Sequence, residues 1–166
     1  MAKTESFDIT TGVDLQEVDN AVNQARKEIA NRYDFRRVVA EIEFDRKVPK
    51  LTIHTENDFK LEAIWEALSQ RLRARHVPLK NLKRGVVEKA AGSTIRQDIG
   101  ITQSIDGDTA RKLVKFMKDQ NYRKVQSSIQ GDEVRVSAPS RDELQAVIRD
   151  LQAEEWGIEL KFGNYR

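Results

Sequence analysis

The sequence predicts a protein of the α+β class in which one order of elements occurs twice. Stretches with a hydrophobic period of two, typical of strands with one buried face, occur in both halves of the chain. Each half also contains two stretches whose apolar residues recur at helical spacing. In each half a short polar turn separates two neighbouring strand patterns, which predicts a hairpin.

The second half shows this pattern most clearly. Residues 124–130 and 133–138 both alternate between apolar and polar side chains, and Gly131 begins the turn between them. Ser140 and Glu143 then have the spacing of a capping box, which predicts the start of a helix. Apolar residues follow at helical spacing: Leu144, Val147, Ile148 and Leu151. This part of the chain is therefore expected to form a hairpin covered by a capped helix.

The first half has the same order of signals. The expected elements are a strand at 6–10, a helix capped at 14–17 and ending near 31, strands at 40–45 and 51–55, a helix at 58–75 and an extended segment at 79–90. Pro78 lies directly after the second of these helices, where a proline stops helical structure.

The remaining elements give the second half a matching order. They are a strand at 94–102, a helix at 106–119 with Asp106 or Asp108 as its N-cap, and a last strand at 157–162. Residues 90–93 have the most flexible composition in the chain, so we expect a domain boundary there, with domains at 1–91 and 92–166.

Both halves therefore read strand, helix, strand, strand, helix, strand. That order predicts two tandem ferredoxin-like units, each a four-stranded antiparallel sheet with two helices on one face. The first strand is short, and short edge strands specify their partners weakly, so it could instead pair with the second unit.

Composition restricts the compartment and the chemistry. The chain has 166 residues, of which 39% are hydrophobic and 34% are charged, with a net charge of +2 and no cysteine. It has no apolar run near the roughly 20 residues of a membrane span, and its N-terminus lacks the pattern of a secretion signal. We expect a cytoplasmic protein without a membrane anchor. The absence of cysteine excludes disulfides and thiolate chemistry.

The sequence indicates no catalytic centre. His54 and His76 have no partners at metal-ligand spacing, and phosphate-binding glycine loops and nucleophile-elbow motifs are absent. The many carboxylates are interspersed with basic residues, which is the pattern of a solvated surface. We therefore expect no enzymatic activity, no metal and no cofactor.

Three stretches are candidates for binding an anionic partner. The first holds six basic residues and no acidic one, namely Arg71, Arg73, Arg75, Lys80, Lys83 and Arg84. Cations at a helix end, together with ordinary solvation, would explain it equally. The second is the basic face of the helix at 106–119, with Lys112 and Lys115, which is also what the solvent side of an amphipathic helix looks like.

The third stretch is residues 33–36, which combine aromatic rings, a carboxylate and a guanidinium. These groups can stack on a base, accept a hydrogen bond from its edge and pair with a phosphate. A strand entry with one buried aromatic side chain would explain the same residues.

Several stretches together resemble the YajQ family of bacterial proteins, in order and over essentially the whole length. They are residues 6–9, 13–18, 33–36, 124–126, 129–136, 140–147 and 164–166. The resemblance implies tandem ferredoxin-like, RNA-binding-protein-like domains that bind nucleotides without an established enzymatic activity. Some members are described as cyclic-di-GMP effectors that act through a transcription regulator, and others are linked to RNA.

Together these observations lead us to expect a non-catalytic nucleotide-binding protein, whose ligand is cyclic di-GMP, GTP or ATP. Arg36 and either Lys112 or Lys115 would contact phosphates. Phe35 or Tyr33 would contact a base, and Asp8 or Asp34 the edge of a base or ribose. The candidate nucleotide-binding residues are Phe7, Asp8, Tyr33, Asp34, Phe35, Arg36, Lys112 and Lys115. The alternatives are an RNA-binding protein and a protein-interaction module without a small ligand.

Overall fold

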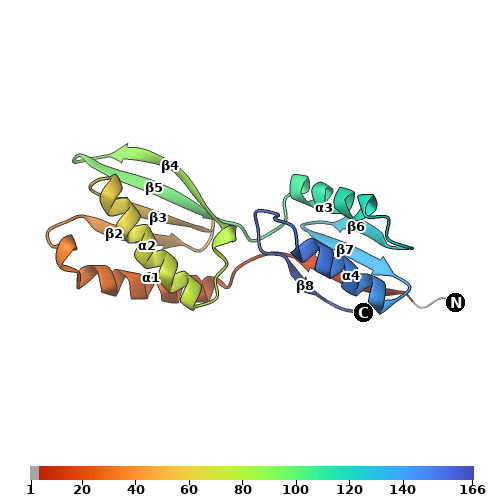
Figure 1. Cartoon of the computed structure of the whole chain (residues 1–166). Helices are drawn as coiled ribbons and strands as arrows, with labels where there is room; N and C mark the ends of the chain where they lie inside the picture. Colours follow the sequence, from red (N-terminus) through yellow and green to blue (C-terminus); the bar gives the residue numbers. More distant parts are fainter. Residues whose placement is uncertain (1–3) are drawn as a thin grey trace. The chain divides into compact units, whose positions relative to one another are not determined.

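The computed structural model describes residues 4–166, which form two compact units. The central unit contains residues 13–102, and the terminal unit combines the N-terminal residues up to Gly12 with residues 103–166. Figure 1 shows that both units are built from helices and sheets. Each unit has its own hydrophobic core.

The central unit is a four-stranded sheet with the order β2-β3-β5-β4. Its elements are α1 (Leu15–Ala30), the 3₁₀ turn η1 (Tyr33–Phe35), β2 (Ala40–Asp45), β3 (Lys50–Thr55), α2 (Asp58–Ala74), the 3₁₀ turn η2 (Leu79–Asn81), β4 (Leu82–Ala90) and β5 (Thr94–Ile101). Both helices cover one face of the sheet, as Figure 1 shows. Leu51, Ile53 and Ile99 are fully buried beneath them.

The terminal unit is a second four-stranded sheet, with the order β6-β7-β1-β8. Its elements are β1 (Glu5–Thr10), α3 (Gly107–Asp119), β6 (Gln126–Gln130), β7 (Glu133–Ala138), α4 (Arg141–Gln152) and β8 (Lys161–Gly163). Phe7, Val136 and Leu144 belong to the core between this sheet and its helices.

The predicted helix starts are confirmed. The carboxylate of Asp14 accepts a hydrogen bond from the backbone N–H of Gln16 at the start of α1. Asp106, one of two candidates for the cap of α3, accepts from the N–H of Thr109. The hydroxyl of Ser140 accepts from the N–H of Glu143 at the start of α4. These caps satisfy backbone donors that the first turn of a helix leaves unpaired.

The two units are ferredoxin-like, but they exchange their first strands. β1 pairs with β7 and β8 in the terminal unit, which is the cross-pairing that the sequence left open. β5 pairs with β3 and β4 in the central unit. Each of these two strands occupies the position that the other would have held in a simple tandem repeat.

This exchange places the division of the chain away from the predicted boundary near residue 91. That boundary falls in the turn between β4 and β5, where Gly92 and Ser93 both have positive φ, and the two strands continue as one hairpin. The structure divides the chain after Gly12 and after Thr102. The apolar alternation of a strand specifies its buried face but not the strand beside it. The pattern alone therefore could not distinguish a simple tandem repeat from two units that exchange their first strands.

The last strand is shorter than its alternation predicts. Only Lys161–Gly163 pair with β1, whereas residues 157–160 have no regular structure. Gly157 has a φ of 76°, and the carbonyl of Glu159 accepts a hydrogen bond from the hydroxyl of Thr11 instead of joining a ladder. The apolar side chains of this segment still pack on the core, which accounts for the alternation.

We expect a fragment of residues 13–102 to fold by itself, because all strands and helices of the central unit are contiguous in that range. Fragments 1–91 and 92–166 would each lack an inner strand of their sheet, so two ladders would be left unpaired and the core exposed. Circular dichroism during heating is the measurement. Cooperative unfolding of fragment 1–91 alone would contradict the strand exchange.

Candidate functional site

Three cavities of this protein differ in size, and the one with the greatest volume, about 570 Å³, lies in the terminal unit. Its lining consists of Glu5, Ser6, Arg141, Leu144, Gln145, Tyr165 and Arg166. Two hollows in the central unit have volumes of only about 130 and 260 Å³. Ligand sites in proteins typically enclose about 300–1,000 Å³, so the cavity of the terminal unit alone among these three has the size for a nucleotide.

Three parts of the fold meet at this cavity. Glu5 and Ser6 begin β1, and Leu144 projects from the first turns of α4, where it is buried in the core. The chain after β8 forms the third wall. The backbone N–H of Arg166 donates to the carbonyl of Ser6 at 3.0 Å, and the N–H of Ser6 donates to the carbonyl of Arg166 at 3.1 Å.

The cavity has one aromatic wall and one cationic side chain, Arg141, because the guanidinium of Arg166 lies beside Asp8 on the other face of β1. The ring of Tyr165 lies 6.2 Å from the ring of Phe7, centroid to centroid, and the residue is still 61% exposed. Arg141 donates to the carboxylate of Glu5 at 3.4 Å, while its side chain remains largely exposed. A planar ligand can therefore stack on the ring, and its anionic groups can reach a guanidinium.

Asp8 lies beside this site, but its side chain is on the face of β1 that the helices do not cover. Although only 3% exposed, its carboxylate accepts hydrogen bonds from Arg135 Nε at 3.0 Å and from Asn164 Nδ2 at 2.6 Å. A guanidinium nitrogen of Arg166 lies 3.7 Å away. The hydrogen bond from Arg135, opposed by burial and assisted by Asn164, lowers the pKa of this carboxyl below its ordinary value.

The structure separates the predicted nucleotide-binding residues. Phe7, Asp8, Lys112 and Lys115 belong to the terminal unit, and the residues at 33–36 belong to the central unit. Phe7, one of these predicted residues, is fully buried. Its ring contacts Tyr165, which lines the cavity. Lys112 and Lys115 are on α3, outside the cavity lining, and Lys115 pairs with Asp119 at 3.3 Å.

The candidate stretch at 33–36 forms a separate surface in the central unit, where residues 33–35 are the 3₁₀ turn η1. Tyr33 is 82% exposed, and the guanidinium of Arg36 lies 5.5 Å from the centre of its ring. Phe35 is 6% exposed and belongs to the core, so of the two aromatic candidates only Tyr33 is available for stacking. Asp34 is held by Arg32, whose guanidinium donates to both carboxylate oxygens at 2.8 and 3.0 Å.

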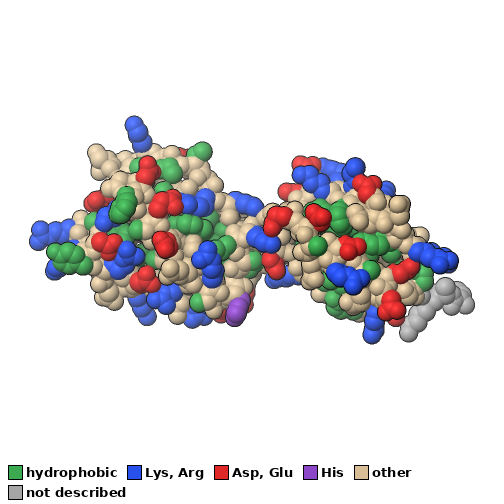
Figure 2. Space-filling view, in the orientation of Figure 1, with side chains coloured by type: hydrophobic (Ala, Val, Ile, Leu, Met, Phe, Trp, Pro, Cys, Tyr) green, Lys and Arg blue, Asp and Glu red, His purple; other side chains and the backbone are tan. Residues whose placement is uncertain are grey.

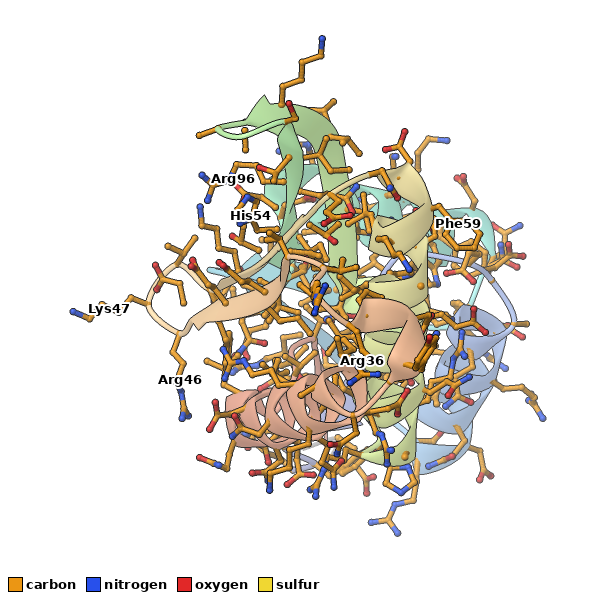
Figure 3. All side chains as sticks on the ribbon, turned by 90° about the vertical axis from the view of Figure 1, so that its left-hand side faces the viewer. Arg36, Arg46, Lys47, His54, Phe59 and Arg96 are labelled. Atoms are coloured by element: carbon orange, nitrogen blue, oxygen red, sulfur yellow. The ribbon has the colours of Figure 1, made fainter. Side chains whose placement is uncertain are left out.

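More exposed side chains accompany this turn. Lys60 donates from its ammonium to the carbonyl of Asp34, so the start of α2 lies beside the turn. Phe59, the preceding residue, is 78% exposed. Figure 3 shows Arg36 and Phe59 on the end of the central unit that faces the viewer. This end therefore presents two aromatic rings together with cations.

The basic stretch at 71–84 is not an open cationic patch. Arg71 pairs with Glu28 and Arg75 with Glu17, both at 2.9 Å, which joins α2 to α1. Arg84 donates to both carboxylate oxygens of Glu62, and its guanidinium covers the ring of Trp65. Figure 2 likewise shows side chains of both signs interspersed over the visible face. Within the described residues, half of the predicted patch is thus neutralised by carboxylates.

Comparison with known proteins decides the family. A family model described as nucleotide-binding protein YajQ-like matches residues 5–166. A nucleotide-binding protein of Desulforamulus reducens is 48% identical over 166 residues, covering 100% of this chain and 99% of that protein. Nucleotide-binding proteins of Bacillus cereus (strain AH187) and Bacillus anthracis (strain CDC 684 / NRRL 3495) are 46% identical over the full length of both chains.

The chain belongs to the YajQ-like family. Three of the stretches that carry its YajQ resemblance, residues 6–9, 140–147 and 164–166, come together at the cavity of the terminal unit. Arg141, Gln145, Tyr165 and Arg166 were absent from the candidates chosen on sequence. Their common position in family-like stretches, although far apart in the chain, was the signal that could have identified them.

In residues 4–166 no group of three or more His, Asp or Glu side chains could hold a metal ion. The same residues include no helix that is long and apolar enough to cross a membrane.

Asp8 should stabilise the terminal unit in a pH-dependent way. Its pKa is lowered by folding, so its contribution is present above the ordinary carboxyl value of 3.8 and is lost as the pH falls through the folded-state pKa. We expect Asp8→Asn to lower the free energy of unfolding by about 2 kcal/mol at pH 7, the scale for hydrogen bonds to a charged group. Below about pH 3.8 the difference from wild type should shrink.

Each unit has one tryptophan, Trp65 in the central and Trp156 in the terminal unit. Denaturant unfolding monitored by Trp156 fluorescence in a Trp65→Phe background therefore reports the terminal unit. A stability difference that stays constant between pH 3 and pH 7 would contradict this account of Asp8.

Proposed function

We propose that this protein binds a nucleotide without transforming it, and that the cavity of the terminal unit holds the ligand. The supporting observation is the convergence of three family-like stretches on a 570 Å³ cavity with an exposed tyrosine ring. Tyr165 would stack on the base, and Arg141 would contact a phosphate. Glu5 and Gln145 offer acceptors, and Gln145 also donors, for the edge of the base.

The proposal of binding without catalysis rests on the side chains that line the cavity. They include no histidine or lysine, and their one carboxylate, that of Glu5, accepts a hydrogen bond from Arg141. The nearby Asp8 is already occupied by two hydrogen-bond donors, so it is poorly placed to accept a proton from a ligand.

The relatives are named nucleotide-binding proteins, and that name supports the ligand class. For this chain we propose cyclic di-GMP, GTP or ATP as ligand, and we propose that it acts as an effector on a transcription regulator. Cyclic di-GMP, GTP and ATP all have a purine base that can stack and phosphates that can pair with a guanidinium. These two kinds of contact are therefore expected with each of the three ligands. Recovery of a regulator only when nucleotide is present would support the effector role.

Loss of the ring or of the guanidinium should weaken nucleotide binding. We expect Tyr165→Ala to reduce affinity by about 5- to 150-fold, since stacking contributes about 1–3 kcal/mol per base. Arg141→Gln should reduce it similarly through a lost charge-assisted hydrogen bond. Isothermal titration calorimetry with cyclic di-GMP, GTP and ATP is the measurement, followed by chromatography to check that the nucleotide is recovered unchanged.

Arg149→Gln is the matched control, because Arg149 lies in the last turn of the same helix and does not line the cavity. If Tyr165→Ala and Arg141→Gln bind nucleotide as tightly as the control Arg149→Gln, the cavity is excluded as the site. No heat at about 1 mM of any of these ligands, corresponding to roughly 4 kcal/mol of binding, would count against nucleotide binding itself.

A second function, binding of single-stranded RNA, is favoured by the exposed rings of Tyr33 and Phe59. Exposed aromatic rings flanked by cations stack on successive bases and contact the backbone. This surface lies in the central unit and shares no residue with the cavity, so the two functions are separable by mutation.

We expect Tyr33→Ala to weaken RNA binding by about 5- to 150-fold. Arg36→Gln should weaken it and make the slope of log affinity against log salt shallower by about 0.7, the value for one phosphate contact in a single strand. Fluorescence anisotropy with a labelled single-stranded RNA at several salt concentrations measures both effects. Tyr165→Ala serves as control here, and a salt-independent affinity would rule out this mode.

A further inference from the structure

We propose that Asp8 and Asn164 position the nucleotide site, by selecting the strand register that places Tyr165 at the cavity. This inference rests on the proposed nucleotide-binding function, but its structural part can be tested without a ligand. It concerns the point at which the chain leaves β8 and returns to β1.

The pairing between β1 and the C-terminal segment contains one extra residue. Thr10 lies opposite Lys161 and Asp8 opposite Gly163, a regular antiparallel register. If that register continued, Ser6 would lie opposite residue 165. Ser6 instead exchanges both backbone hydrogen bonds with Arg166. Two residues of the C-terminal segment therefore oppose Phe7 alone, which is the arrangement of a β-bulge.

Asn164 is the residue that makes this bulge possible. Its φ of 57° lies in the left-handed region, which asparagine tolerates better than most other non-glycine residues. In one type of β-bulge, the G1 bulge, a residue with positive φ is the means by which a strand absorbs an extra residue.

The bulge decides which face of the sheet Tyr165 occupies. Phe162 shares the helix-covered face with Phe7, since their rings lie 5.8 Å apart. With strict alternation, residue 164 would follow Phe162 onto that face and Tyr165 would point to the other one. The observed contacts are the reverse, because Asn164 bonds to Asp8 and the ring of Tyr165 lies beside Phe7. A shift of one residue moves every later side chain to the opposite face.

The bond between Asn164 and Asp8 supplies the preference for the bulged register. Asp8 is buried, so its carboxylate needs donors, and Asn164 Nδ2 occupies Oδ2 while Arg135 Nε occupies Oδ1. In the regular register Asn164 could not reach this face, and one oxygen of a buried carboxylate would lose its closest donor. The carboxylate on one face of β1 thereby holds an aromatic wall on the other.

The proposal can be tested by exchanging the carboxylate of Asp8 and the amide of Asn164. Asn164→Asp would place two carboxylates against each other, so the bulge should be lost and Tyr165 should leave the cavity. In the double variant Asp8→Asn with Asn164→Asp, the new amide can donate to the new carboxylate, and its oxygen can still accept from Arg135. We expect nucleotide affinity to fall at least tenfold in the single variant and to return to within threefold of wild type in the double variant.

The structural readout is the set of nuclear Overhauser effects between the rings of Phe7 and Tyr165 in the full-length protein without ligand. We expect them in wild type, their loss in Asn164→Asp and their return in the double variant. Asn121→Asp is the matched control, because Asn121 also has a positive φ, of 55°, but lies at the end of α3. It should retain both the ring contacts and the affinity.

Persistence of the ring contacts in Asn164→Asp, or their failure to return in a folded double variant, would overturn the proposal. If Asn164→Asp does not fold, Asp8→Asn alone replaces it. That variant leaves one amide oxygen for two donors, and unchanged ring contacts in it would be equally decisive. A wild-type protein that shows the ring contacts but binds no nucleotide would refute the proposed function and leave the register proposal standing.

Discussion

Each sheet of this protein depends on an inner strand that the order of the chain assigns to the other half. β1 has β7 and β8 as neighbours, and β5 has β3 and β4, so both strands pair along both edges. An inner strand satisfies backbone groups on its own two edges and on the strands beside it. The exchange therefore ties the two units together covalently at two points, after Gly12 and after Thr102, although each unit keeps a separate core.

Phe7 and Asp8 are adjacent in β1 and make different contacts on the two faces of the terminal sheet. Phe7 fills the core and supports the ring of Tyr165, whereas Asp8 fixes Asn164 and Arg135 on the face without helices. Burial of the Asp8 carboxylate is tolerated because charged and polar donors surround it. The first strand is thus a structural element and the support of the candidate site at once, and the strand exchange is what delivers it to the terminal unit.

Sequence patterns predicted the elements well and their neighbours poorly. Period-two alternation and the caps at Asp14 and Ser140 depend on contacts within a few residues, and the structure confirms them. The strands that pair with β1 and β5 are determined by contacts between distant parts of the chain. The alternation of apolar and polar residues does not predict those contacts.

The candidate site was harder to predict for the same physical reason. Aromatic composition at Phe7 and Phe35 could not distinguish a ring in the core from a ring on the surface. The pairing of Arg71, Arg75 and Arg84 with acids on neighbouring elements was likewise invisible in a local count of charges. Tyr165 lies beyond the predicted last strand at 157–162, and its contact with Phe7 joins parts of the chain that a local pattern cannot relate.

The position of Tyr165 is difficult to explain by stability alone. Phe7 and Phe162 already close the core at this end of the sheet, and most of the Tyr165 side chain remains exposed beside an open cavity, so its burial contributes little. A left-handed residue and an interrupted ladder are unfavourable, whereas a regular strand would avoid both. Backbone strain of this kind persists where surrounding interactions enforce it, and such places are commonly functional. Here the enforcing group is the Asp8 carboxylate, and the result of the strain is an aromatic wall on a cavity of nucleotide size.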